Sequence, residues 1–549
     1  MATLVPSSEE HTKESETRDQ NFSYESDDNT EVIEAATGRS VSGYTRRDEK
    51  DMRRMGKQQE LMRNFRRLSS FSFTVMLTAT WEYLLIANTQ GLTNGGLAGL
   101  WWSFVWSFFL LGLIMLSLAE MASMAPTSGG QYHWVSEFAP PKYQKPLSYL
   151  TGWMSALSWQ AGNASGSYLT GSLIQALITI NNPDYDPTNW QGVLLMFSMV
   201  LVLFLANVFG AKKLPLGQNF LVVMHCALLV VFVAMYAALA PHVSAADVFT
   251  TFTNDGNWAS MGLSLMIGQI SAIYSLVGSD AIAHMAEEVT SAGLSVPSAM
   301  IWSYILNGIL AMFILLAYLF TLTSPDDALN DPTDYPYIWA LKQALPDSTR
   351  GVTALTFLIL LLIIAANIDY NAATARQTWS FARDKGFPGH RWIATVHPTL
   401  HVPVNSIVLT CLITCLLALI NIGSSIAFNA IISLQLVALM FSYTVSIGCV
   451  LHRRLTRPDL LPKARWSLGR WGVPVNTAAV AYAVFAFFWS FWPAGTPVDT
   501  SSMNYGVVMF GGVGVMCAVS YWVQGRHIYK GPVATVAGRE GDVRELVPS

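Results

Sequence analysis

Charged residues are scarce in this chain of 549 residues. Asp, Glu, Lys and Arg make up only 12% of it, whereas soluble domains hold about 25%. Hydrophobic residues make up 52%, and the mean hydropathy is +0.37. This shortage of charge argues against a soluble multidomain enzyme and against a disordered protein. The net charge of −4 argues against a nucleic-acid partner, because it supplies no basic field for a polyanion.

Cysteine is also scarce. The five cysteines are odd in number and all fall inside apolar runs, so we expect packing residues and no disulfide framework. No spacing of Cys with His is typical of a metal site. No phosphate-binding loop and no set of nucleophile, base and orienting residue is present. We therefore expect neither an enzyme nor a bound cofactor or metal, and no ATP-driven pump.

The first 67 residues lack long apolar runs. Residues 1–67 are rich in Ser, Thr, Asp and Glu and become basic after Arg46, which predicts a disordered cytosolic tail. No apolar stretch follows the first charges, so we expect no cleavable signal peptide. Ubiquitin-ligase adaptors are an expected partner of this tail, with attachment at Lys13, Lys50 or Lys57.

Apolar runs long enough to cross a bilayer recur after this tail. They predict twelve membrane spans, near residues 72–92, 98–122, 147–179, 191–210, 217–240, 260–283, 298–322, 352–374, 402–421, 426–450, 474–493 and 504–523. Twelve spans with membrane lipid around them suit a secondary transporter. The chain is therefore expected to be an all-α membrane protein.

Basic residues of the loops predict the orientation of these spans. With the amino terminus inside, fourteen Lys and Arg residues fall in cytoplasmic loops and only Lys342 and Arg350 fall outside. Cytoplasmic loops carry the excess of basic residues, so both termini are expected in the cytosol. The plasma membrane is the expected location, with the vacuolar membrane as the alternative.

Three motifs stand in order along the chain. They are SLAEMASMAPTSGGQYHW at 117–134, GSDAIAHMAEEV at 278–289 and ARQTWSFARDKGFP at 375–388. In these motifs the sequence resembles the fungal amino-acid/choline transporter family of the amino acid–polyamine–organocation superfamily. The resemblance covers about residues 65–525. It also points to a charge network at the inner face around Arg376, Arg383 and Asp384.

The resemblance implies a fold with an internal repeat. Spans 1–5 and 6–10 should form a 5+5 inverted-repeat core over residues 68–451, spans 11 and 12 should be additions over 452–523, and 524–549 should be a cytosolic tail. Spans one and six should be broken at mid-membrane with the substrate between them. Broken helices offer free backbone groups, and a half-helix amino terminus favours an anionic group.

Span six carries the better supported half of the expected site. Gly278 permits unwound backbone, and Tyr274, Ser275 and Val277 precede it. The alternative for Gly278 is close helix packing without a substrate role. Asp280 follows the break and could face the substrate amine, although capping a half-helix or orienting a neighbour is the stronger interpretation.

Span one departs from the superfamily because residues 68–90 contain no Gly. Counting back from Gly95 places its break near Thr80, Trp81 and Glu82. A carboxylate at mid-membrane costs about 2.5–3.5 kcal/mol or more, so Glu82 is expected to bind a cationic amine or accept a proton. The alternative is an ion pair that locks two helices. Trp81, Tyr83 and Tyr274 could stack on an ammonium group, or simply pack.

His225 lies inside span five and could titrate near physiological pH. We therefore expect proton coupling at His225 or Glu82, with a buried neutral His as the equal alternative for His225. The predicted function is proton-coupled alternating-access transport of a small amine-containing solute such as an amino acid, γ-aminobutyrate or choline. Two alternatives stay open: import or export of an alkaloid-like metabolite, and a nutrient sensor of the same fold that does not transport.

Overall fold

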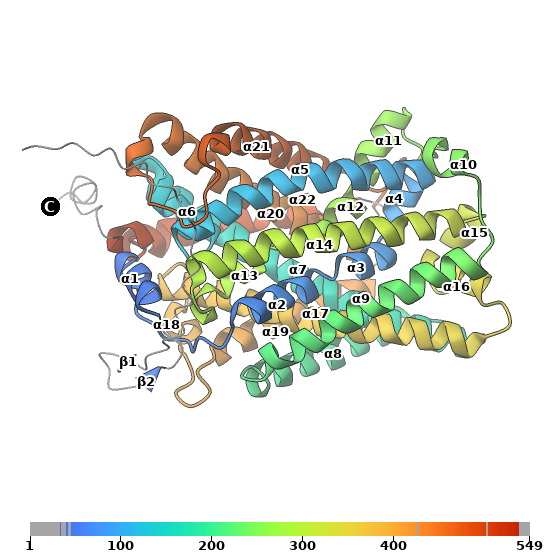
Figure 1. Cartoon of the computed structure of the whole chain (residues 1–549), viewed down its shortest axis with the longest axis horizontal. Coiled ribbons are helices and arrows are strands. Elements are labelled where there is room, and N and C mark those ends of the chain that lie inside the picture. Colours follow the sequence, from blue (N-terminus) through green and yellow to red (C-terminus); the bar gives the residue numbers. More distant parts are fainter. Residues whose placement is uncertain (1–32, 35–39, 42–44, 424–426, 501–502, 537–549) are drawn as a thin grey trace, which may run out of the picture.

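Helices make up almost the whole of the described structure. The computed structural model describes residues 33–34, 40–41, 45–423, 427–500 and 503–536. Within these ranges the strands are one antiparallel pair of two residues each, β1 (Ile33–Glu34) and β2 (Ser40–Val41). The long helices lie side by side along the long axis of the molecule (Figure 1). The predicted all-helical class is confirmed, as expected where lipid offers the backbone no hydrogen-bond partner.

Nine helical stretches of the described chain are long and apolar enough to cross a membrane. They are α5 (Gly96–Met124), α8 (Asn189–Phe209), α9 (Leu214–Leu239), α14 (Ala292–Thr321), α17 (Thr349–Arg383), α19 (Val404–Gly423), α20 (Ala427–Thr456) and the stretches that contain α21 (Gly472–Trp489) and α22 (Gly506–Ser520). Each coincides with a predicted span. Lengths of this order match a hydrocarbon core of about 30 Å.

The other three predicted spans have a different structure. The third coincides with α7 (Gln144–Asn181), which has 38 residues but many Ser, Gly, Gln and Asn side chains. The first and sixth coincide with interrupted helices, described below. The count of twelve and the inverted repeat therefore stay predictions.

Short helices connect the long ones at the two ends of the bundle. They are α4 (Thr89–Thr93), α6 (Gln131–Phe138), α10 (Ala245–Thr250), α15 (Pro325–Leu329), α16 (Pro336–Ala344), α18 (His390–Ile393) and α23 (Arg526–Ile528). The connections α10, α15 and α16 lie at one end of the molecule, and α6 and α18 lie at the other (Figure 1). The charged motifs of the sequence thus gather at the second end.

The centre of the bundle is built around α7, which packs against both α17 and α20. Small residues allow this close approach. A Cβ atom added at Gly162 of α7 would lie 2.1 Å from the hydroxyl of Tyr370 on α17. Glycine at this position therefore brings the two helices together, as small residues commonly do in membranes.

The first predicted span is broken at Ala79. Helix α2 (Arg67–Thr78) ends there and α3 (Thr80–Ile86) begins, with Ala79 in the left-handed conformation at φ 35°. This conformation costs an L-residue about 1–2 kcal/mol. Asn307 of α14 stabilises the break, because its side-chain amide donates to the Val75 carbonyl (2.9 Å). The break was predicted near residues 80–82, and the structure places it one residue earlier, at Ala79. An alanine therefore takes the left-handed conformation that glycine usually adopts at a break.

The sixth predicted span is broken at the expected glycine. Helices α11 (Met261–Gly268) and α12 (Ile270–Leu276) lead to Val277, whose backbone is extended. Gly278 follows at φ +110°, and the short helix α13 (Ala281–His284) begins three residues later. A φ of this size is accessible to glycine and strained for other residues.

Residues 45–67, which we call the N-terminal strap, depart from the disorder predicted for 1–67. The helix α1 (Arg46–Arg54) begins at Thr45, whose hydroxyl accepts from the Asp48 N–H (3.1 Å). Met52, Met55 and Phe65 are buried. The strap lies against the end of the bundle that carries α6 and α18 (Figure 1). The polar and basic composition predicted disorder because the strap cannot form a core by itself. The folded bundle supplies the apolar surface that buries the strap and the acidic side chains that pair with it.

Ion pairs attach the strap to several helices. Arg54 pairs with Glu137 of α6 (2.6 Å), and Lys57 pairs with Asp384 after α17. Burial opposes ionisation of Glu137, but the hydrogen bond with His133 and the charge of Arg54 outweigh it and lower the pKa of Glu137 to about 2. The strap is thus held by carboxylates that are ionised at neutral pH.

Candidate functional site

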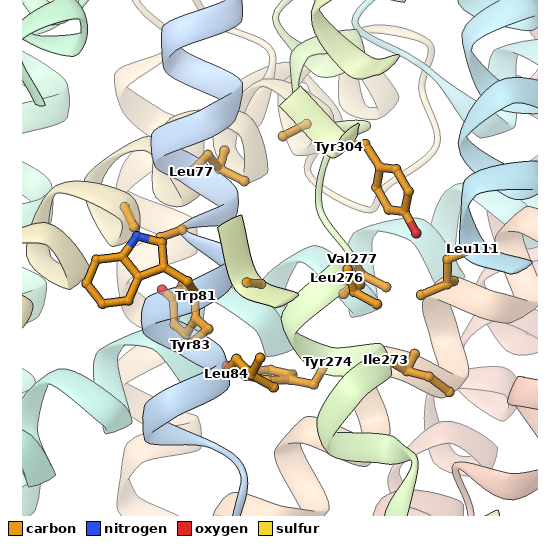
Figure 2. Packing of buried hydrophobic residues seen from close by; sticks show 14 of the residues in the cluster. Leu77, Trp81, Tyr83, Leu84, Leu111, Ile273, Tyr274, Leu276, Val277 and Tyr304 are labelled. Atoms are coloured by element: carbon orange, nitrogen blue, oxygen red, sulfur yellow. The ribbon is translucent and has the colours of Figure 1, made fainter. Parts of the chain in front are cut away.

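The two helix breaks lie next to each other. A Cβ atom added at Gly278 would lie 3.5 Å from side-chain carbons of both Leu77 and Thr78, at the end of α2. Figure 2 shows α3 and α12 facing each other, with Tyr83, Leu84 and Tyr274 between them. At the second break, the Ala281 N–H donates to the Gly278 carbonyl (2.9 Å) and the Ala283 N–H to the Asp280 carbonyl (2.9 Å). Non-helical backbone from both breaks therefore meets in one region.

An aromatic pair covers this region on one side. The rings of Tyr83 and Tyr274 meet edge to face with centroids 6.0 Å apart. The Tyr274 hydroxyl hydrogen-bonds Ser165 of α7 (3.1 Å), and Ser165 donates to Gln435 of α20 (3.1 Å). The pair is thus tied to helices on both sides. The sequence carried no signal for Ser165 and Gln435, because their role depends on contact with Tyr274.

A cavity of about 340 Å³ lies beyond this aromatic pair. It is lined by the ends of α3 and α12, by α7 and α20, and by the loop before α16. Tyr274 is the predicted site residue that lines it. Thr80, Glu82 and Gly278 are buried and do not line the cavity, and Val277 is 6% exposed.

Glu82 and His225 form a buried pair. Oε1 of Glu82 lies 2.6 Å from Nδ1 of His225 on α9, and both side chains are fully buried. The second oxygen of Glu82 and Nε2 of His225 have no hydrogen-bond partner among the described residues. The sequence placed Glu82 near mid-membrane and His225 inside the fifth predicted span but did not indicate that they meet. A shared proton between carboxylate and imidazole is the chemistry this geometry allows.

Trp81 shields this pair. Its ring lies 5.7 Å from those of both His225 and Phe232, measured between centroids. Figure 2 shows Trp81 on the side of α3 away from Tyr274. Trp81 and Glu82 therefore face α9, whereas Tyr83 and Tyr274 face each other, because consecutive residues of a helix point in directions about 100° apart.

The remaining predicted residues lie near the breaks with local partners. The Ser275 hydroxyl donates to the Ala272 carbonyl of its own helix (3.0 Å). Asp280 accepts from the Gln131 side chain of α6 (2.6 Å) and is fully buried. This contact favours the interpretation of Asp280 as a residue that holds α6 against the broken span.

Buried ion pairs join the segment after α13 to the last turns of α17. Arg383 makes two hydrogen bonds of 2.7 Å to Glu287, and Arg376 donates to Glu288 (2.7 Å). Burial opposes ionisation of Glu287, but the charge of Arg383 outweighs it and keeps the pKa of Glu287 below its ordinary value. The second and third sequence motifs thus meet in space.

Replacement of Gly278 by alanine is expected to reduce function sharply. The added methyl group has room, but φ +110° is strained for alanine, which costs about 1–3 kcal/mol or shifts the break. The expected result is a loss of solute uptake at an unchanged amount of folded protein. Gly389→Ala is the control, because Gly389 also has positive φ but lies in open space. Normal uptake by Gly278→Ala would show that the break geometry is not needed.

Comparisons with known proteins agree with this architecture. A family model described as amino acid permease matches residues 64–513. Amino-acid permease 2 of Neurospora crassa is 26% identical over 521 residues, which cover 94% of each chain. The choline transporter of Saccharomyces cerevisiae is 26% identical over 454 residues, 81% of this chain and 78% of its own.

A further relative is an uncharacterized amino-acid permease of Schizosaccharomyces pombe, 28% identical over 501 residues, or 89% of this chain and 90% of its own. The matched residues include both helix breaks and all three sequence motifs. Permeases move solutes and are not enzymes. The chain thus belongs to the amino acid permease family, and it is a multi-pass membrane transporter of amino acids or related solutes.

Proposed function

We propose that this protein is a proton-coupled carrier of a small amine-containing solute, which works by alternating access. The two adjacent breaks support this proposal, because backbone N–H groups at a helix break suit a carboxylate and backbone carbonyls suit an amine. Tyr83 and Tyr274 then form the aromatic surface beside the solute. The names of the relatives supply the candidates, which are amino acids and choline, and γ-aminobutyrate completes the set.

The Glu82–His225 pair is the observation that carries the proton coupling. A buried carboxylate and imidazole 2.6 Å apart can exchange and hold a proton away from water. Glu82 lies on α3, directly after the break of the first span, and His225 lies on α9. A change in the protonation of the pair is therefore transmitted to the break, which is where the solute is proposed to bind.

The proposal includes the arrangement in the membrane. We place twelve spans across the bilayer, with α2–α3, α7 and α11–α12 completing the nine stretches above. Both termini lie in the cytosol, because basic residues collect at the end of the molecule that carries α1 and α6. The plasma membrane is the proposed location. Ubiquitin attachment suits Lys50, which is exposed on α1, better than Lys57, which is paired with Asp384.

Uptake into proteoliposomes tests the proposed function. Labelled choline, γ-aminobutyrate and a set of amino acids are offered to the purified protein with and without an inward proton gradient. The expected result is accumulation of at least one solute that depends on the gradient. Uptake that only equilibrates would contradict proton coupling. Ligand binding without any flux, in liposomes that contain folded protein, would favour a sensor.

A further inference from the structure

The cavity beside Tyr274 is lined by a carboxylate that has no ion pair among the described residues. Among the described residues that line it, Asp334 alone is charged. Asp334 lies in the loop between α15 and α16, with φ +59° and its N–H bonded to the Asp331 carbonyl (2.9 Å). The loop thus holds the Asp334 backbone in a fixed turn at the rim.

The neighbouring carboxylate behaves differently. Asp331 accepts two bonds from Lys342, at 2.8 and 2.9 Å, and one from the Thr333 hydroxyl. Asp331 is therefore held in an ion pair with Lys342. No ion pair of Asp334 occurs in the described part of the chain, and its burial, followed by the nearby Asp331 charge, raises the pKa of Asp334. A cation that approaches Asp334 would therefore stabilise the negative charge of its carboxylate.

The rest of the lining suits an organic cation. Tyr168, Tyr274 and Tyr335 contribute aromatic surface, and Gln90 and Gln175 contribute amides. Aromatic rings together with a carboxylate are a common environment for ammonium groups. At about 340 Å³ the cavity is near the lower end of ligand pockets, so it suits a small solute.

The surrounding loops add to the same field. Asp184 and Asp186 stand just before Pro187 and Thr188, which line the cavity. A cleft with one sign of charge raises the local concentration of ions of the opposite sign. Solutes with a net negative charge are repelled for the same reason.

We propose that this cavity is an outer reception site for small solutes with a net positive charge, and that Asp334 determines this preference. The inference rests on the proposed function, because the cavity is taken to face the outside and to lead to the two breaks. It adds a preference for ammonium cations such as choline over zwitterionic and anionic amino acids.

The test compares Asp334→Asn with the wild-type protein in proteoliposomes, with choline and a zwitterionic amino acid as probes. The expected result is a KM for choline that is raised about three- to tenfold at low salt, with the maximal rate unchanged. The reason is that the charge of Asp334 acts on the arrival of choline at the cavity and not on the later transport steps. The KM of the zwitterion should stay the same. Added salt should raise the choline KM of the wild type more than that of the variant, which keeps only the charges of the surrounding loops.

Asp326→Asn is the matched control. It removes the same charge from an exposed position on α15 in the same loop and outside the cavity lining. An equal change of the choline KM in Asp326→Asn and Asp334→Asn would overturn the proposal. The KM would then depend on the net charge of this end of the molecule and not on the position of Asp334 in the cavity. An unchanged choline KM in Asp334→Asn would also overturn it.

Direct binding separates the two proposals. Binding of labelled choline to the purified full-length protein is measured for the wild type and for Asp334→Asn. If no solute is transported but choline binding falls in the variant, the proposed function fails and the reception site stands. If transport is normal and choline binding and KM are the same in both proteins, the reception site is wrong and the proposed function stands.

Discussion

Replacement of Glu82 by glutamine is expected to abolish accumulation driven by the proton gradient. Glutamine has the shape of the protonated glutamate but cannot release a proton, so the Glu82–His225 pair loses its exchangeable charge. Exchange of internal for external solute should remain, because it needs no net proton movement. Proteoliposomes loaded with unlabelled solute measure exchange, and empty ones with an acidic outside measure accumulation.

Two further variants make this result specific. Asp369 is another fully buried carboxylate, which accepts from Gln218 (2.7 Å), so Asp369→Asn is the matched control and should keep proton-driven accumulation. His225→Ala is a less clean test, because an unpaired buried charge costs about 3–5 kcal/mol and reduces the amount of folded protein. Full accumulation by Glu82→Gln, or its loss in Asp369→Asn alone, would remove the pair from the coupling mechanism.

The second large effect is expected at the N-terminal strap. Asp48 is buried and accepts the N–H groups of Ser291 (2.9 Å) and Ala292 (3.0 Å) at the start of α14, with Arg63 at 3.6 Å. Asp48→Asn removes the charge from this site. Hydrogen bonds to charged groups contribute about 1.5–3 kcal/mol, and about 1.4 kcal/mol corresponds to a factor of ten. Exchange of the Ser291 and Ala292 amides should therefore become about ten- to hundredfold faster.

Hydrogen exchange followed by mass spectrometry checks this result on the purified protein. Glu49→Gln is the matched control, because Glu49 lies on the same helix but pairs only with exposed Arg53 (2.6 Å). Surface pairs of this kind contribute little, so exchange in Glu49→Gln should equal that of the wild type. Equal exchange in Asp48→Asn would mean that the strap does not hold the start of α14.

The family motifs and the composition were sufficient to predict the broad organisation. Apolar runs depend on the local sequence, and they predicted the positions of the long helices because lipid requires each helix to satisfy its own backbone. Gly278 was predicted as a break because glycine permits unwound backbone, and its φ of +110° agrees with that reason. The break at Ala79 was one residue away from its predicted place, because the backbone there is held by Asn307, a residue 229 positions from Thr78.

By itself, the sequence determined the helical class and the long apolar runs, and it placed Glu82 and His225 inside two of those runs. Only the tertiary structure decided that these two residues meet across 143 positions, that Trp81 faces α9, that the strap is ordered and that Asp334 is the charged residue among the described ones that line the cavity. The reason is physical. Burial and helix formation follow from neighbours in the chain, whereas the pairing of side chains depends on how each helix is rotated against the next.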